Sequence, residues 1–239
     1  MKRVLLFFCL VVFLTIKPVF SQDDKQHEVS WDVPELFEFH DVIYQVWHTA
    51  WPEKNIKMLT ELTPDIIAGV EKVTNAKLPG ILREKESKWK EEVVKLNFIT
   101  NNFKGAVEKK DSVKILDEAE KLHGQFEKLV RTIRPMVKEL DAYHQTLYIL
   151  YHYYIQEYDY DKIKMSVTEL LKKMEDLNKA TLPERLAAKT GDFDVARKNL
   201  STSLNSLNEI VIKNEGQDKI KAAVEIMHSN YQKVEAVFD

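Results

Sequence analysis

Histidine is the residue of this chain whose type and spacing point to chemistry. Six of its seven histidines fall into three pairs, and the members of each pair stand 104 or 105 residues apart. Imidazole nitrogens are ligands for zinc, copper and nickel ions and for haem iron. Histidines repeated at one separation therefore predict a binding site that occurs twice. The pairs are His40 with His144, His48 with His152, and His123 with His228.

A tyrosine lies between the first two histidines of each copy. His40, Tyr44 and His48 follow one another at four-residue steps, and Tyr148 holds the middle place in the second copy. Residues four apart share one face of an α-helix. Neighbouring apolar residues continue this face at three- and four-residue steps, which predicts a stripe buried in a helical core. They are Leu36, Phe37, Ile43, Trp47 and Trp51.

Four helices with short loops are predicted for each copy, because caps and prolines divide the chain into periodic segments. Asp32 is the expected N-cap of the first helix, and Asp111 that of the fourth. The sequence thus predicts an all-α protein of two tandem antiparallel four-helix bundles, related by an internal duplication and covering residues 33–134 and 135–239. The expected helices span about 33–51, 56–76, 83–107 and 112–134, then 136–158, 162–178, 193–213 and 217–239.

Helix geometry predicts which histidines meet inside each bundle. With a rise of about 1.5 Å per residue, His40 and His123 lie at the same level on antiparallel first and fourth helices. The same arithmetic sets His144 against His228. We therefore predict these inward-facing pairs as metal or cofactor ligands. His48 and His152 lie roughly 12 Å further along their helices and are predicted as outer metal ligands.

Other residues complete or replace this site. Two histidines do not fill a metal coordination shell, so carboxylates are required, and the candidates are Glu127, Glu61 and Glu169. Gln232 stands at the position of Glu127 in the second copy, which predicts that the two sites are unequal. Met58 and Met165 are expected in the core, with thioether ligation as the alternative.

A purely structural interpretation of the histidines stays open. A histidine on an aromatic helix face commonly packs in the core, hydrogen-bonded to a carbonyl or a tyrosine. A histidine near a helix C-terminus, as His48 and His152 are, also complements the helix dipole. Seven of the nine tyrosines lie between Tyr143 and Tyr160, which predicts aromatic packing between the two bundles, with an exposed binding patch as the alternative.

The fourth helix of each copy resembles a known family. The runs His123-Gly124-Gln125-Phe126 and His228-Ser229-Asn230-Tyr231 are similar to the His-x-x-aromatic end of the cytochrome c-prime and soluble cytochrome b four-helix bundles. In that family this histidine is an axial haem ligand, so the resemblance implies the bundle fold and haem b binding. The attachment cysteines of the c-type members are missing, and His40 and His144 stand where the b-type member has Met.

Three functions follow from these residues. A bound transition metal ion, copper or zinc, needs little space, whereas haem requires a cleft that Phe37, Tyr44, Trp47 and Trp51 would fill. We therefore predict a non-enzymatic metal-binding protein. Non-covalent haem b binding for electron transfer or sensing, and a ligand-free scaffold or chaperone-like binder, are the alternatives. The sequence contains no Gly-rich phosphate loop, no serine nucleophile motif and no repeated Glu-x-x-His pair, which argues against an enzyme.

The start of the chain predicts export. Lys2 and Arg3 precede an apolar run that is too short to span a membrane, and cleavage after Ser21 would release residues 22–239, with 22–32 as a loose segment. Cys9 is the only cysteine and would be removed, so no disulfide or thiolate site is expected. Cleavage would also remove three of the 35 basic residues and leave 32 against 38 acidic ones. The resulting net negative charge argues against a nucleic-acid partner. A periplasmic or secreted location is predicted.

Overall fold

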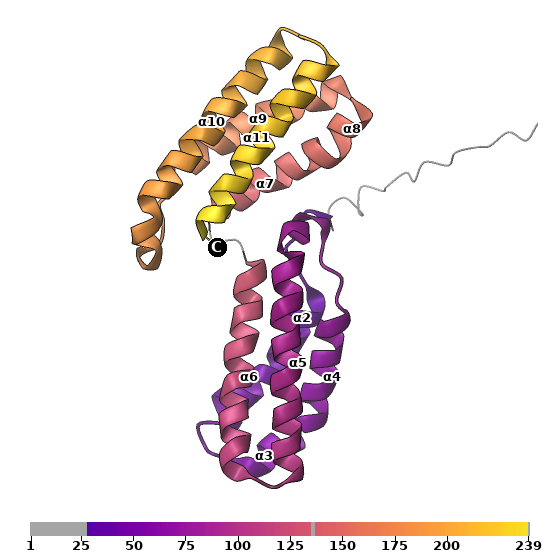
Figure 1. Cartoon of the computed structure of the whole chain (residues 1–239), viewed down its shortest axis with the longest axis vertical. Coiled ribbons are helices and arrows are strands. Elements are labelled where there is room, and N and C mark those ends of the chain that lie inside the picture. Colours follow the sequence, from indigo (N-terminus) through magenta and orange to yellow (C-terminus); the bar gives the residue numbers. More distant parts are fainter. Residues whose placement is uncertain (1–27, 135–136, 239) are drawn as a thin grey trace, which may run out of the picture.

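A computed structural model describes residues 28–134 and 137–238, and every regular element within these ranges is helical (Figure 1). The all-α prediction is thereby confirmed. The predicted signal peptide, residues 1–21, lies outside the described residues, as does most of the predicted loose segment. Among the helices that the structure describes, none is both long and apolar enough to cross a membrane.

The first half of the chain forms four rods that pack side by side (Figure 1). The first rod is an α-helix that continues directly into a π-helical turn, and the third begins with a 3₁₀ turn. The elements are α2 (Pro34–Gln45) with η1 (Val46–Ala50), α3 (Ile56–Glu61) with α4 (Thr63–Asn75), η2 (Gly80–Lys85) with α5 (Glu86–Glu108), and α6 (Ser112–Ile133).

The second half contains the same elements in the same order. Five of its elements begin 104 or 105 residues after their counterparts, namely α7 after α2, η3 after η1, η4 after η2, α10 after α5 and α11 after α6. The helix α9 begins 104 residues after α3 and takes the place of both α3 and α4. This recurrence supports the internal duplication that the sequence suggests. The elements are α7 (Lys138–Ile149) with η3 (Leu150–Tyr154) and α8 (Ile155–Glu157), α9 (Tyr160–Lys179), η4 (Glu184–Lys189) with α10 (Thr190–Ile212), and α11 (Gln217–Glu235) with η5 (Ala236–Phe238).

Two of the predicted helix starts are wrong in detail. The N-cap of α2 is Val33, and Asp32 instead accepts a hydrogen bond from Ser30 at 2.9 Å. The helix expected from residue 193 begins three residues earlier, because α10 starts at Thr190. Asp111 does cap α6, because its carboxylate accepts a hydrogen bond from the backbone N–H of Lys114 at 3.1 Å.

Each half has its own core of buried apolar side chains. On the first rod the buried stripe lies beside the predicted one, and the predicted members His40 and Tyr44 are exposed. The physical reason is that aliphatic and phenyl groups need no polar partner when buried, whereas imidazole and phenol groups do. The buried stripe consists of Leu36, Phe39, Ile43, Val46 and Ala50.

Close helix packing in the first half depends on one glycine. A Cβ atom at Gly69 of α4 would overlap the ring of Phe39 on α2, which is itself buried. A Cβ atom at Gly105 of α5 would meet no atom within 4 Å. The fold therefore has room for a methyl group at Gly105 but not at Gly69.

We expect Gly69→Ala to lower the free energy of unfolding by about 1–3 kcal/mol, because the methyl group forces Phe39 out of its place. Gly105→Ala is the matched control and should raise stability by up to about 1 kcal/mol through helix propensity. Urea titration followed by circular dichroism measures both changes. Equal effects of the two substitutions would show that α2 and α4 are not in close contact at Gly69.

Candidate functional site: a histidine and aromatic face in each half

The predicted histidines lie on two equivalent faces, one in each half, formed by the first and last rods. Both faces carry a His, a Tyr and a second His from the first rod, an aromatic residue beside the second His, and a His from the last rod. We call the first the open face (His40, Tyr44, Trp47, His48 and His123) and the second the covered face (His144, Tyr148, Tyr151, His152 and His228).

Stacked rings join the first and last rods on the open face. His40 stacks on Phe126 with 5.6 Å between ring centroids. Trp47 stacks on His123 at 4.3 Å, with 4° between the ring planes. Each pair thus contains one imidazole and one aromatic ring, and the imidazole comes from α2 in one pair and from α6 in the other. Only the edges of these imidazole rings are available for hydrogen bonds or coordination.

The covered face repeats this arrangement. His144 stacks on Tyr231 at 4.3 Å between centroids, and Tyr151 stacks on His228 at 4.1 Å. The outer histidine of each face also contacts the tyrosine one turn earlier, with centroids 4.7 Å apart for Tyr44 and His48 on the open face. The two faces therefore agree in the ring contacts between their rods as well as in sequence.

Each outer histidine lies in a π-helical turn, η1 or η3. In η1 the backbone N–H of Trp51 bonds to the carbonyl of Val46, five residues earlier, at 2.9 Å. Such turns are rare and are frequently found at functional sites. Because residues of a π turn do not advance by 100° and 1.5 Å each, the ideal-helix arithmetic fails at this point.

The predicted levels of the histidines are wrong by about one turn, because side-chain packing and not residue count sets the offset between the two antiparallel rods. His40 lies opposite Phe126 rather than His123, and His123 lies opposite Trp47. The predicted inward orientation is also wrong for His40, whose side chain is exposed, whereas His144 is buried. The three imidazoles of the open face are still neighbours, because His48 and His40 both lower the pKa of His123 electrostatically.

The first half of the chain itself partly covers the covered face, of which His144 and Tyr148 are buried. Arg83 of η2 donates a hydrogen bond to the hydroxyl of Tyr148 at 3.4 Å and lies 3.3 Å from Nδ1 of His152. The same hydroxyl donates to Glu28 at 2.9 Å. Tyr148 is 3% exposed and belongs to the apolar core of the first half, although it lies on α7.

A glycine permits this close contact. A Cβ atom at Gly80 would overlap the Tyr148 hydroxyl and the Glu28 carboxylate. The residue 104 positions later is Glu184, at the start of η4, and η4 contains no buried residue. Arg83 and Glu84 likewise correspond to Ala187 and Ala188. Only the first of the two equivalent turns carries the residues that dock on a histidine face.

Glu84 makes the second polar contact of the docked turn. Its carboxylate accepts a hydrogen bond from the side-chain amide of Gln232 at 2.6 Å and lies 3.8 Å from Nε2 of His228. On the open face the corresponding carboxylate belongs to the face itself, because Glu127 holds the position of Gln232. Burial lowers the pKa of His123, and the charge of Glu127 opposes that shift. The two faces therefore differ in charge at one defined point.

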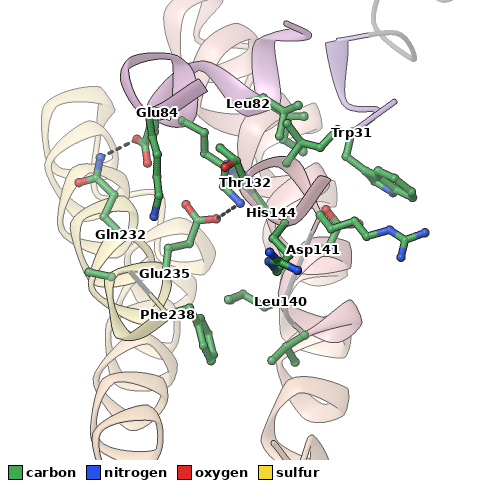
Figure 2. A pocket seen from close by; sticks show the side chains of 18 of the residues that line it. Trp31, Leu82, Glu84, Thr132, Leu140, Asp141, His144, Gln232, Glu235 and Phe238 are labelled. Atoms are coloured by element: carbon green, nitrogen blue, oxygen red, sulfur yellow. Dashed lines mark hydrogen bonds and ion pairs between the residues drawn. The ribbon is translucent and has the colours of Figure 1, made fainter. Parts of the chain in front are cut away.

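A cavity of about 580 Å³ remains between the two halves beside the covered face (Figure 2). His144 and Asp141 lie on one side of it, and Glu84, Gln232 and Glu235 lie on the other (Figure 2). Burial raises the pKa of Asp141. Polar and apolar groups are mixed around this space, so the docked turn fills the junction only in part.

Burial sets the protonation of the covered histidines. It lowers the pKa of His144 to about 3, assisted by the charges of His228, Lys85 and His152. The pKa of His152 is lowered by burial and then by Arg83, and that of His228 by burial against the opposing effects of Glu84 and Glu225. These imidazoles are neutral when the face is covered at neutral pH.

The remaining predicted ligands are scattered. Glu61 pairs with Lys57 at 3.7 Å and Glu169 with Lys172 at 3.9 Å, whereas Met58 packs against the first core and Met165 is exposed. Within residues 28–134 and 137–238, no three His, Asp, Glu or Cys side chains are arranged to hold a metal ion. Metal binding through His40, His48, His123, His144, His152 and His228 therefore stays a prediction.

The tyrosines between 143 and 160 serve several contacts. Tyr148 and Tyr153 pack against the first core, in line with the predicted junction packing. Tyr160 instead donates a hydrogen bond to the carbonyl of Val211 at 2.6 Å within the second half. Tyr143 is buried, and its hydroxyl has no hydrogen-bond partner among the described residues.

Sequence reasoning missed the docking residues Glu28, Gly80, Arg83 and Glu84. Aligning the two copies gives a signal for three of them, because Gly80, Arg83 and Glu84 differ from Glu184, Ala187 and Ala188, although Ile81 differs from Arg185 as well. Comparison with family models, curated proteins and solved structures finds no match to this chain. The resemblance to the cytochrome c-prime bundles therefore stays a prediction from sequence.

We expect Gly80→Glu to release η2 from the covered face, because the larger side chain occupies the place of the Tyr148 hydroxyl. Hydroxyl-radical footprinting should then show a several-fold increase in oxidation of Tyr148. The reciprocal change Glu184→Gly, in the exposed turn η4, is the control and should leave Tyr148 protected. Unchanged protection in Gly80→Glu would mean that the close approach at Gly80 is not required for docking.

Acid should weaken the fold through His144. Its folded pKa is about 3, below the ordinary 6.5, so stability is fully present above pH 6.5 and is lost as the pH falls towards 3. Between pH 7 and pH 5 the parent chain should lose about 2 kcal/mol more than His144→Phe, which keeps a ring on Tyr231. Urea titrations at both pH values measure this difference.

The matched control is His40→Phe, at the equivalent but exposed position. It should lose as much stability as the parent chain over the same pH interval. An identical loss in His144→Phe would contradict a buried, neutral imidazole at this site.

Proposed function

We propose that this chain is a non-enzymatic binding protein whose open face docks a short helical turn of a protein partner. One observation carries this proposal. The covered face, built from equivalent residues with equivalent ring contacts, already binds such a turn, namely η2. The open face has the same construction, yet Tyr44 is 54% exposed and nothing in the described chain covers it as η2 covers Tyr148.

Rigid aromatic rings at a surface favour this role. Exposed aromatic side chains with few rotatable bonds supply contact area at a low entropy cost on binding. On the open face these rings are held in place by stacking across two rods, so the surface is preorganised. The predicted signal peptide leads us to propose that this binding takes place in the periplasm or outside the cell.

Metal binding is the second candidate. Three imidazoles near one another favour it. Burial lowers the pKa of His123, and the charges of His48 and His40 lower it further, so His123 lies beside two other nitrogen ligands of the kind that zinc or copper binds. A bound ion would need donors beyond these rings, and Glu127 is the carboxylate beside His123. Stacking of His40 and His123 on different aromatic rings does not favour haem between them.

A synthetic peptide of residues 77–88, which contains η2, tests the docking proposal when it is added to the full chain. We expect saturable binding by fluorescence anisotropy and a shift of the Trp47 indole N–H signal by NMR, since this indole belongs to the open face. Tyr44→Ala and His48→Ala should each weaken binding at least about fivefold, a loss of roughly 1 kcal/mol.

The equivalent peptide of residues 181–192, which contains η4, is the matched control and should not bind. Failure of the 77–88 peptide to bind at millimolar concentration, or binding that Tyr44→Ala leaves unchanged, would contradict the docking proposal. Stoichiometric zinc or copper, retained in equilibrium dialysis and lost in His48→Ala and His123→Ala, would instead favour the metal-binding candidate.

A further inference from the structure

The open face differs from the covered face in the charge that a docked turn would meet. Gln232 supplies an amide donor to Glu84 on the covered face, at 2.6 Å. Glu127 occupies the same position on the open face, where its carboxylate is half-buried and pairs with Arg131 at 3.4 Å. A glutamate docked as Glu84 is docked would place two carboxylates together, which opposes binding.

One polar contact of the covered face has no counterpart on the open face. Glu225 accepts a hydrogen bond from the hydroxyl of Tyr151 at 3.0 Å on the covered face. Its counterpart on the open face is the exposed Glu120, and Trp47, the counterpart of Tyr151, has no hydroxyl group to offer it. The carboxylate beside His123 on the open face is therefore Glu127, whose partner in its own helix, Arg131, is exposed.

The position that receives Arg83 is retained on the open face. On the covered face the guanidinium lies 6.0 Å from the ring centroid of Tyr148 and beside His152. Tyr44 and His48 form the same tilted ring pair, at 4.7 Å and 39° compared with 4.4 Å and 46° for Tyr148 and His152. An arginine fits this pair through its charge and its planar donors.

We infer that the partner of the open face presents a basic turn, in which an arginine at the position of Arg83 is followed by a lysine or arginine at the position of Glu84. The arginine contacts Tyr44 and His48, and the second cation contacts Glu127. This inference rests on the proposed docking function and adds the chemistry of the partner.

A second copy of this chain does not supply such a turn. Its η2 carries Glu84 and already contacts its own covered face through Arg83 and Glu84. Its η4 carries Ala187 and Ala188 at the two positions in question. The geometry therefore points to a different protein as the partner.

Charge-swapped peptides test this inference on the full chain. The 77–88 peptide with Glu84→Lys should bind about five- to tenfold more tightly than the parent peptide, because a like-charge contact becomes an exposed ion pair. The Glu127→Gln substitution gives the open face the same residue as Gln232 of the covered face. The affinities of the two peptides for this variant chain should differ by no more than about twofold. Circular dichroism confirms that the variant is folded.

The outcomes separate this inference from the proposed function. Equal affinity of the two peptides for the parent chain overturns the basic-turn inference and leaves docking intact. Absence of binding by both peptides overturns docking as well. Concentration-dependent dimers in analytical ultracentrifugation that Tyr44→Ala abolishes would identify a second copy as the occupant and overturn the inference.

Discussion

Stacking of flat rings between the first and last rods is the interaction on which both faces depend. Each half contains two such stacked pairs. In one pair the imidazole comes from the first rod and the aromatic ring from the last, and in the other pair the imidazole comes from the last rod. These contacts seal the edge of an aliphatic core with groups that also tolerate water. They hold the outer tyrosine and histidine in one geometry, whether or not anything covers them.

The same geometry has two different environments within one chain. On the covered face the surrounding protein removes His144 and Tyr148 from water, and burial keeps the imidazole neutral. On the open face Tyr44 and His48 keep the same ring contact in solvent. The first half of the chain thus displays the same arrangement of rings that it covers in the second half.

Helix positions followed from the sequence because caps, prolines and apolar periodicity are local signals. The orientation of the histidines did not follow, for two physical reasons. Counting residues from the helix starts assigned His40 to the level of His123, but side-chain packing sets the offset between antiparallel rods, and Trp47 in the π turn Val46–Ala50 stacks on His123 instead. The cover over Tyr148 and His152 depends on Gly80 and Arg83, which lie far away in sequence, in the other half. No periodicity within one helix contains that information.

The turn η4 has a consequence for assembly. A contact in which the turn of one unit docks on the face of the next is head-to-tail, and repeated between molecules it generates an open-ended filament rather than a closed ring. Within the described residues one histidine face, that of the first half, is not covered by η2 or η4. Glu184, Ala187 and Ala188 hold the positions of Gly80, Arg83 and Glu84, so η4 lacks the groups with which η2 contacts such a face, and a head-to-tail series of these contacts between molecules is not expected.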